Sequence, residues 1–155
     1  MYVIINDAAQ AYKDVIPDDC WHDPYMPLDE LKQEIEDGVM FWGIEEEGNL
    51  VGVMGIQERG DVTLIRHAYI LTSKQNSGIG TNLLHHLEGM TTKPILIGTW
   101  AAAIWAIRFY ERNGYYPLSR IETERLLKTY WNIPARQIAT SVVLANPAWE
   151  AASKG

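Results

Sequence analysis

Residues 75–80 read Gln-Asn-Ser-Gly-Ile-Gly and separate an apolar stretch from an amphipathic one. Two glycines one residue apart let the backbone come close to a ligand. The first turn of a helix that follows presents unpaired N–H groups and the positive end of its dipole, which together suit phosphate oxygens. The pattern is neither a dinucleotide fingerprint nor a Walker loop, because it lacks the third glycine of the first and the Gly-Lys-Ser/Thr ending of the second.

A second motif begins about thirty residues after the first, where residues 106–115 read Ala-Ile-Arg-Phe-Tyr-Glu-Arg-Asn-Gly-Tyr. The glycine loop resembles the Q/R-x-x-G-x-G/A pyrophosphate loop of the GCN5-related N-acetyltransferases (GNAT), and the second motif resembles that family's A-x-x-F-Y-E-x-x-G-F segment. Two motifs in the family's order are much more specific than either alone. The alternative is a glycine turn in an unrelated α/β protein, followed by an ordinary capped helix. The resemblance extends from about Tyr2 to Leu144.

The resemblance implies an enzyme that transfers the acetyl group of acetyl-coenzyme A to a primary amine within a ternary complex. The loop would hold the diphosphate on its backbone amides, and the strand before it would pair with the pantetheine arm as an added strand does. No metal is expected, since the single cysteine and the four histidines have no metal-ligand spacing. The residues predicted to bind the cofactor are Tyr69, Ile70, Leu71, Gln75, Asn76, Ser77, Gly78, Ile79, Gly80, Thr81 and Tyr110.

Tyr110 and His67 are the predicted catalytic residues. In the family, the hydroxyl at the Tyr110 position protonates the coenzyme A sulfur, and a phenol with a reference pKa of about 10 carries that proton at neutral pH. The glutamate base of histone-type members aligns near Leu64, which cannot take a proton. His67 is then the candidate base, acting through water. A core tyrosine and a histidine that satisfies a backbone carbonyl are the structural alternatives.

The acceptor amine is predicted to enter opposite the coenzyme, between two segments rich in aromatic residues. The predicted substrate residues are His22, Tyr25, Trp131 and Arg136. Aromatic rings suit an amine through cation–π contact, although they suit a hydrophobic core equally well. We favour a small-molecule amine. A protein or peptide acetyltransferase would need an open groove, and a non-catalytic acyl-CoA sensor would keep the loop but lack a base.

Length and charge limit the other possibilities. The 155 residues are enough for one domain with a substantial core, and the net charge of −7 argues against a nucleic-acid or anionic-membrane surface. No apolar stretch is long enough for a bilayer, and the N-terminus lacks the features of a signal peptide. We predict a cytoplasmic protein that binds a small-molecule amine but no nucleic acid or membrane, with a homodimer compatible with these features. Residues 1–146 would form the acetyltransferase domain and residues 147–155 a C-terminal tail.

Hydrophobic periodicity and turn residues predict the elements that would position these groups. Helices are expected over residues 8–15, 28–38, 78–89 and 101–113, with a short helix in the insertion that follows residue 120. Strands are expected over residues 3–5, 39–45, 50–57, 62–71, 94–99, 115–120 and 137–144. The predicted fold class is therefore α/β (α+β): a single GNAT-like domain with a mixed, mostly antiparallel sheet of six to seven strands. About four helices would flank the sheet, which would be splayed between its fourth and fifth strands.

Overall fold

Six strands form one mixed sheet in the computed structural model, which describes residues 1–21, 23–74 and 78–154. The order across the sheet is β1-β2-β3-β4-β6-β5, with β3 and β4 parallel and every other neighbouring pair antiparallel. The strands are β1 (Met40–Glu46), β2 (Asn49–Arg59), β3 (Val62–Ile70), β4 (Ile95–Trp100), β5 (Tyr116–Pro117) and β6 (Ser141–Ala145). The predicted single α/β domain with a mixed, mostly antiparallel sheet is confirmed.

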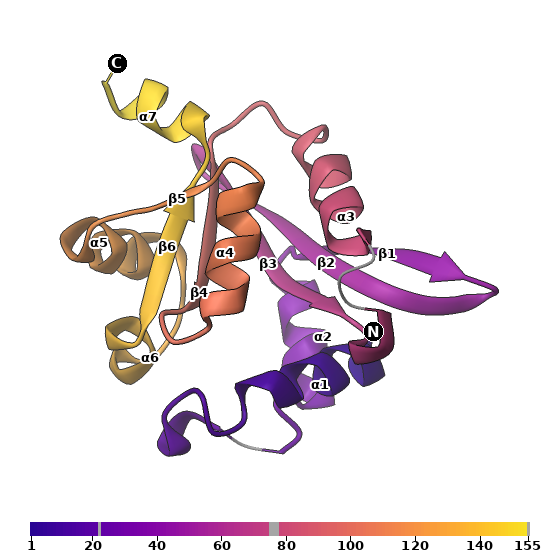
Figure 1. Cartoon of the computed structure of the whole chain (residues 1–155). Helices are drawn as coiled ribbons and strands as arrows, with labels where there is room; N and C mark the ends of the chain where they lie inside the picture. The colour runs from indigo at the N-terminus through magenta and orange to yellow at the C-terminus, as the bar shows by residue number, and fades with distance from the viewer. Residues whose placement is uncertain (22, 75–77, 155) are drawn as a thin grey trace.

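Helices cover both faces of the sheet (Figure 1). Successive residues of β3 face opposite layers: Ile65 packs with Leu84 of α3, whereas Leu64 packs with Leu126 of α5. One layer contains α3 (Ile79–Glu88) and α4 (Ile104–Arg112), and the other contains α1 (Tyr2–Ala8), α2 (Leu28–Glu36), α5 (Arg120–Tyr130) and α6 (Ala135–Ala139). With α7 (Pro147–Lys154), the described residues form seven α-helices, so the prediction of about four was too low.

Residues 3–5 are not a strand, and that prediction was wrong. They belong to α1, whose Ile4, Ile5 and Ala8 are buried against Val53 and Tyr69 of the sheet. A short run of β-branched residues fits a strand, but buried positions one turn apart fit a helix that packs on one side, and packing decides between the two. Because this strand is absent, the splay lies between the third and fourth strands, β3 and β4, and not between the fourth and fifth.

The chain between β4 and β6 is more helical than predicted. β5 has two residues, and α5 begins directly after Ser119, whose Oγ accepts a hydrogen bond from the Glu122 backbone N–H at 3.2 Å. This is a typical N-cap, and it ends the expected strand over residues 115–120 early. α6 occupies the start of the expected last strand, which begins only at Ser141. Residues 147–154 form α7, whose Trp149 packs against the cluster around Leu96.

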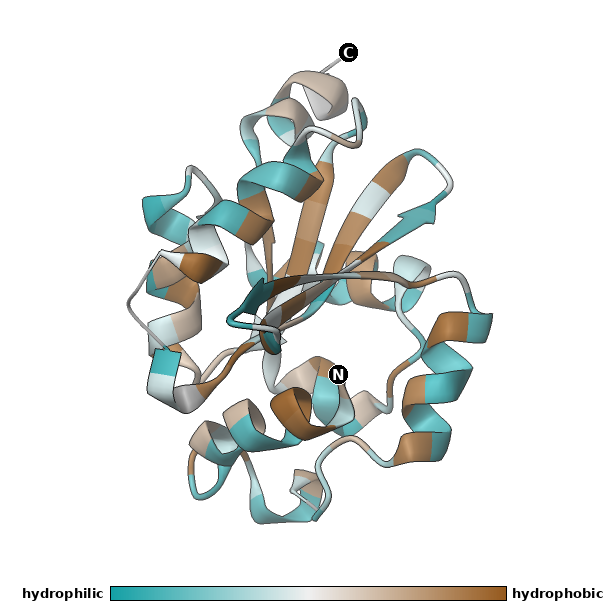
Figure 2. Ribbon diagram, turned by 90° about the vertical axis from the view of Figure 1, so that its right-hand side faces the viewer, coloured by the Kyte–Doolittle hydropathy of each residue, from teal (hydrophilic) through white to brown (hydrophobic). Residues whose placement is uncertain are grey.

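Three short 3₁₀-helices complete the described elements: η1 (Ala9–Tyr12), η2 (Asp18–Cys20) and η3 (Thr72–Lys74). In Figure 2 the central strands show long hydrophobic stretches, whereas hydrophobic and hydrophilic residues alternate along the helices. Within the described ranges, none of the helices has both the length and the apolar character needed to cross a bilayer.

β3 and β4 separate after a short contact. They are paired only from Thr63 with Ile95 to Ile65 with Ile97, although β3 continues to Ile70 and β4 to Trp100. Beyond Ile65 the facing edges of the two strands therefore have backbone groups that are not bonded across the gap. The splay is the feature of the fold that positions the candidate site.

Candidate active site

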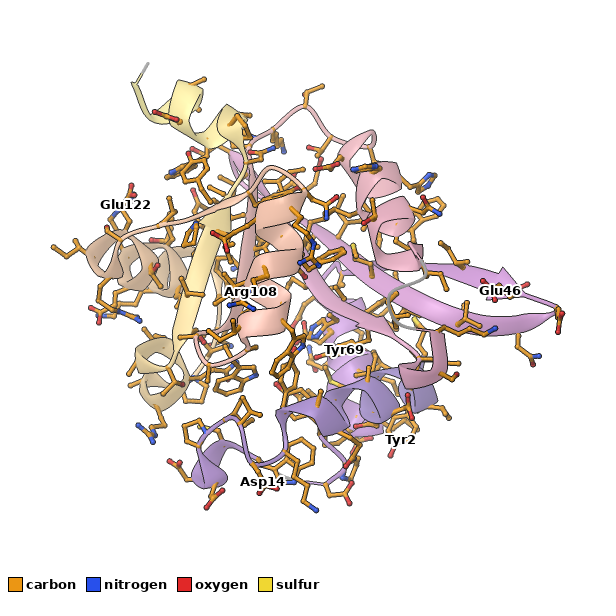
Figure 3. All side chains as sticks on the ribbon, in the orientation of Figure 1. Tyr2, Asp14, Glu46, Tyr69, Arg108 and Glu122 are labelled. Carbon is orange, nitrogen blue, oxygen red and sulfur yellow. The ribbon has the colours of Figure 1, made fainter. Side chains whose placement is uncertain are left out.

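A cavity of about 780 Å³ opens where β3 and β4 separate. Residues from both helical layers line it, among them Gly80 and Arg108 on the α3–α4 side, and Tyr12 and Trp131 on the α1–α5 side. The cavity therefore passes through the sheet. Figure 3 shows Arg108 on α4 and Tyr69 near α1, both of which line the cavity.

Gly78 begins α3 at the edge of this cavity. Its φ of +85° lies in the left-handed region, which glycine adopts without strain, and no side chain of a described residue caps the helix start. Gly80 allows a close approach between helices, because a Cβ there would lie 3.1 Å from a ring carbon of Phe109. Of the residues predicted to bind the cofactor, Gly78, Ile79, Gly80 and Thr81 line the cavity, while Gln75, Asn76 and Ser77 lie outside the described residues.

The cavity is basic although the chain as a whole is acidic. Its described lining contains Arg66, Lys74, Arg108 and Arg112 but no aspartate or glutamate. Arg66 and Lys74 form ion pairs with carboxylates that do not line the cavity. Arg108 and Arg112 are exposed and lie one turn apart on α4. We had not predicted these two arginines, although their four-residue spacing within the second motif was a sequence signal for them.

β3 contains a bulge at His67. Its register with β2 changes from Gly55 opposite Arg66 to Val53 opposite Tyr69, so β3 has one extra residue. His67 has a φ of +54°, which is uncommon for a residue with a side chain. In a regular strand, Arg66 and His67 would point to opposite faces, but here both lie against Glu34 of α2. Arg66 Nη1 lies 3.0 Å from Glu34 Oε2, and His67 Nε2 lies 3.5 Å from Glu34 Oε1.

Glu34 was not predicted as part of the site. Burial alone raises the pKa of its carboxyl group, but the contact with His67 and the charge of Arg66 outweigh burial, so the pKa is lowered. A carboxylate therefore faces the imidazole at neutral pH. At 3.5 Å the contact has an ion-pair distance, and His67 Nε2 has no hydrogen-bond partner among the described residues. The His67 ring also stacks on Phe41, with ring centroids 5.9 Å apart.

Tyr110 is both a core residue and a cavity residue, so it fits the packing role and the catalytic role that the sequence left open. It is 6% exposed and packs edge-on against Phe109 and Tyr115, at ring-centroid distances of 5.1 and 6.1 Å. It also lines the cavity. Burial raises the pKa of its hydroxyl group, so the phenol keeps its proton at neutral pH.

Aromatic side chains line the α1–α5 end of the cavity. Tyr25 and Trp131, two of the predicted substrate residues, lie there, and Tyr12 joins them although it was not predicted. The Tyr12 ring lies 5.4 Å from that of Tyr25 and 5.8 Å from that of Trp105, and Trp100 Nε1 donates a hydrogen bond to the Tyr25 hydroxyl at 2.8 Å. Burial raises the pKa of Tyr12 to about 12, although hydrogen bonding with the Thr99 and Tyr69 side chains opposes this shift. These phenols are therefore neutral groups at physiological pH.

Trp131 lies over Gly98 of β4, where a Cβ would be 3.2 Å from Trp131 Cζ2. Arg136, by contrast, does not line the cavity. Its Nε donates to Asp19 Oδ2 at 3.1 Å, which links α6 to η2 at the protein surface.

Leu71, a further predicted residue, is half-buried and does not line the cavity, whereas the predicted His22 lies outside the described residues. No group of three or more histidine, cysteine, aspartate or glutamate side chains that could hold a metal ion occurs among the residues that the structure describes.

A family model described as an acetyltransferase (GNAT) domain matches residues 7–127. The fold is similar to that of a GNAT-family acetyltransferase from Staphylococcus aureus, with a TM-score of 0.67 and 18% identity over 94% of this chain and 89% of the other. No curated protein sequence matches the chain.

Two other solved structures show the same fold. The PaiA N-acetyltransferase from Thermoplasma acidophilum, in complex with coenzyme A, has a TM-score of 0.62 and 11% identity over 93% of this chain and 87% of the other. The ribosomal-protein-S18-alanine N-acetyltransferase from Escherichia coli has a TM-score of 0.57 and 17% identity over 92% of this chain and 88% of the other. At these identities the likeness concerns the fold alone.

Proposed function

The chain belongs to the GNAT family of acetyltransferases, and from that premise we propose that it acetylates a primary amine of a small molecule by direct transfer from acetyl-coenzyme A. The observation that carries this proposal is the continuous cavity that passes through the splay. Its α3–α4 end is basic and lined by glycine, and its α1–α5 end is aromatic. Two ligands of different chemistry could therefore meet between β3 and β4.

The residues at the basic end fit a phosphorylated cosubstrate, which supplies the thioester to be attacked. The N–H groups of the first turn of α3, from Gly78 onward, suit phosphate oxygens, as do the guanidinium groups of Arg108 and Arg112. The described lining contains no carboxylate that would repel the phosphate groups. The β3 edge beyond Ile65, which includes Tyr69 and Ile70, would hold the extended arm as an added strand.

Tyr110 would act as the proton donor. In the transfer, the amine nitrogen forms a bond to the acetyl carbon while the bond from that carbon to sulfur breaks. The Tyr110 hydroxyl would give its proton to the departing sulfur and would later regain one from solvent. The support for this role is that Tyr110 lines the cavity, and its raised pKa means that the phenol is protonated at neutral pH.

His67 would take the proton that the amine loses, with Glu34 as its orienting carboxylate. The support is the arrangement at the bulge, where a base contacts a group that can fix its orientation and stabilise its positive charge. The left-handed backbone at His67 is a local strain of the kind found at functional sites.

We expect His67→Asn to lower kcat/KM by about a hundredfold at neutral pH, with a smaller deficit at alkaline pH, where more of the amine is already neutral. Asparagine tolerates the left-handed backbone, so the bulge should persist. The measurement is the pH profile of kcat/KM for a single amine. Phe41→Leu, which removes the ring stacked on His67 but no proton acceptor, is the matched control. A deficit of equal size at every pH would show that the histidine is structural.

The proposed function is tested by measuring thiol release from acetyl-coenzyme A with a panel of primary amines, beside calorimetric binding of acetyl-coenzyme A. We expect binding, and thiol release that depends on a small amine. Binding with no release for any amine or peptide would identify an acyl-CoA sensor. Release that depends only on a peptide would identify a protein acetyltransferase, and either outcome would refute the small-molecule assignment.

A further inference from the structure

The α1–α5 end of the cavity contains aromatic rings and neutral polar groups. We call the residues Tyr12, Tyr25, Trp131, Gln137 and Ser141 the acceptor wall. Their polar atoms belong to hydroxyl groups, an indole and one amide. The described lining of the whole cavity has no carboxylate, and Glu34, which contacts the neighbouring His67, is already shared between two basic side chains.

This composition disfavours an acceptor with a second positive charge. A cation on the acceptor would lose its hydration and would find no carboxylate on the acceptor wall to pair with. Cation–π attraction to the rings is weaker than the cost of burying an unpaired charge. The same environment favours the neutral form of the reacting amine, which is the form that can attack a thioester.

The two phenols of the acceptor wall are poor partners for a peptide main chain. Each peptide unit that enters the cavity needs a donor and an acceptor for its own N–H and C=O groups. The Tyr25 hydroxyl already accepts a hydrogen bond from Trp100, and Tyr12 interacts with Thr99 and Tyr69. Trp131 lies over β4 at Gly98 and narrows this end further. A compact apolar body fits these constraints better than an extended chain.

We infer that the acceptor is a monoamine on an apolar or aromatic body, and that diamines, polyamines and peptides are poor acceptors. This inference rests on the proposed acetyl transfer and specifies its substrate class. Recognition would come from ring contacts with the body of the acceptor, while the absence of a carboxylate would exclude compounds with several cationic groups.

The test compares heptylamine with hexamethylenediamine in thiol-release assays of the wild-type protein. The two molecules have nearly the same length and differ in whether the far end is a methyl group or an ammonium group. We expect kcat/KM to be about tenfold or more higher for heptylamine. A short peptide that begins with alanine is assayed beside them and should be slower than heptylamine.

A variant tests the physical cause. Gln137→Glu places a carboxylate of nearly the same shape on the acceptor wall, and it should shift the ratio of the two kcat/KM values about tenfold toward the diamine. Gln137→Met has a similar size without the charge and should not shift the ratio toward the diamine. Should the glutamate variant leave the ratio unchanged, the missing carboxylate is not the cause of the selectivity.

The outcomes separate this inference from the proposed function. Equal or reversed preference in the wild-type protein, or faster acetylation of the peptide, overturns the substrate class while acetyl transfer stands. No thiol release with either amine or with the peptide, in a protein that binds acetyl-coenzyme A, overturns the proposed function and this inference with it.

Discussion

Gly78→Asp is expected to weaken acetyl-coenzyme A binding by about a hundredfold, while Gly78→Asn weakens it far less. Both side chains tolerate the left-handed backbone, and no heavy atom of the described residues lies within 4 Å of a Cβ built at this position. The two variants therefore share the same strain and nearly the same volume. They differ in a negative charge placed at the start of α3, where the phosphate oxygens would lie.

Isothermal calorimetry of the wild-type protein and the two Gly78 variants measures the difference in acetyl-coenzyme A affinity directly. The gap in Kd between the aspartate and asparagine variants should narrow as salt is added, because screening weakens the repulsion. Gly80→Asp is a poor substitute, since its Cβ would crowd the Phe109 ring and would disturb the contact between α3 and α4. Equal affinities of the two Gly78 variants would mean that the phosphates do not bind at this helix start.

Tyr110→Phe is expected to lower kcat by about 10²- to 10⁴-fold while acetyl-coenzyme A affinity changes little. The ring contacts with Phe109 and Tyr115 remain, so the core should keep its packing. The missing hydroxyl would act on the sulfur as the thioester breaks, which is why turnover should suffer more than binding. Steady-state kinetics, with calorimetry for the cofactor, measure both quantities.

Tyr115→Phe provides a matched control within the same aromatic cluster. Its hydroxyl donates to Glu88 Oε2 at 2.8 Å, and the residue does not line the cavity. This variant should lose some stability and keep its kcat. If Tyr110→Phe turns over at nearly the wild-type rate while chemistry is shown to be rate-limiting, Tyr110 is a core residue only. Loss of turnover in Tyr12→Phe instead would transfer the role to that neighbouring phenol.

The sequence alone predicted the parts of this protein whose signals are local. The glycine loop, the motif around Tyr110 and the amphipathic pattern of α3 each occupy a short stretch, and each follows from backbone freedom or helical periodicity. The resemblance of the loop and of the Tyr110 motif to family motifs led to the GNAT family and to the α/β fold, both of which are confirmed. Gly80 and Tyr110, which these signals assigned to the site, line the cavity, and so does Trp131 from the predicted aromatic insertion.

The tertiary structure decided what depends on contacts between distant segments. Residues 3–5 fit a strand or a helix by pattern, and burial of Ile4 and Ile5 against the sheet selects the helix. The bulge at His67 is invisible in a single strand, because it exists only in the register with β2. Glu34 lies 32 residues before Arg66, and the fold alone brings it to that side chain and to His67. A site made of residues that are far apart in the sequence cannot be predicted from their spacing along the chain, because the folded sheet sets the distances between them.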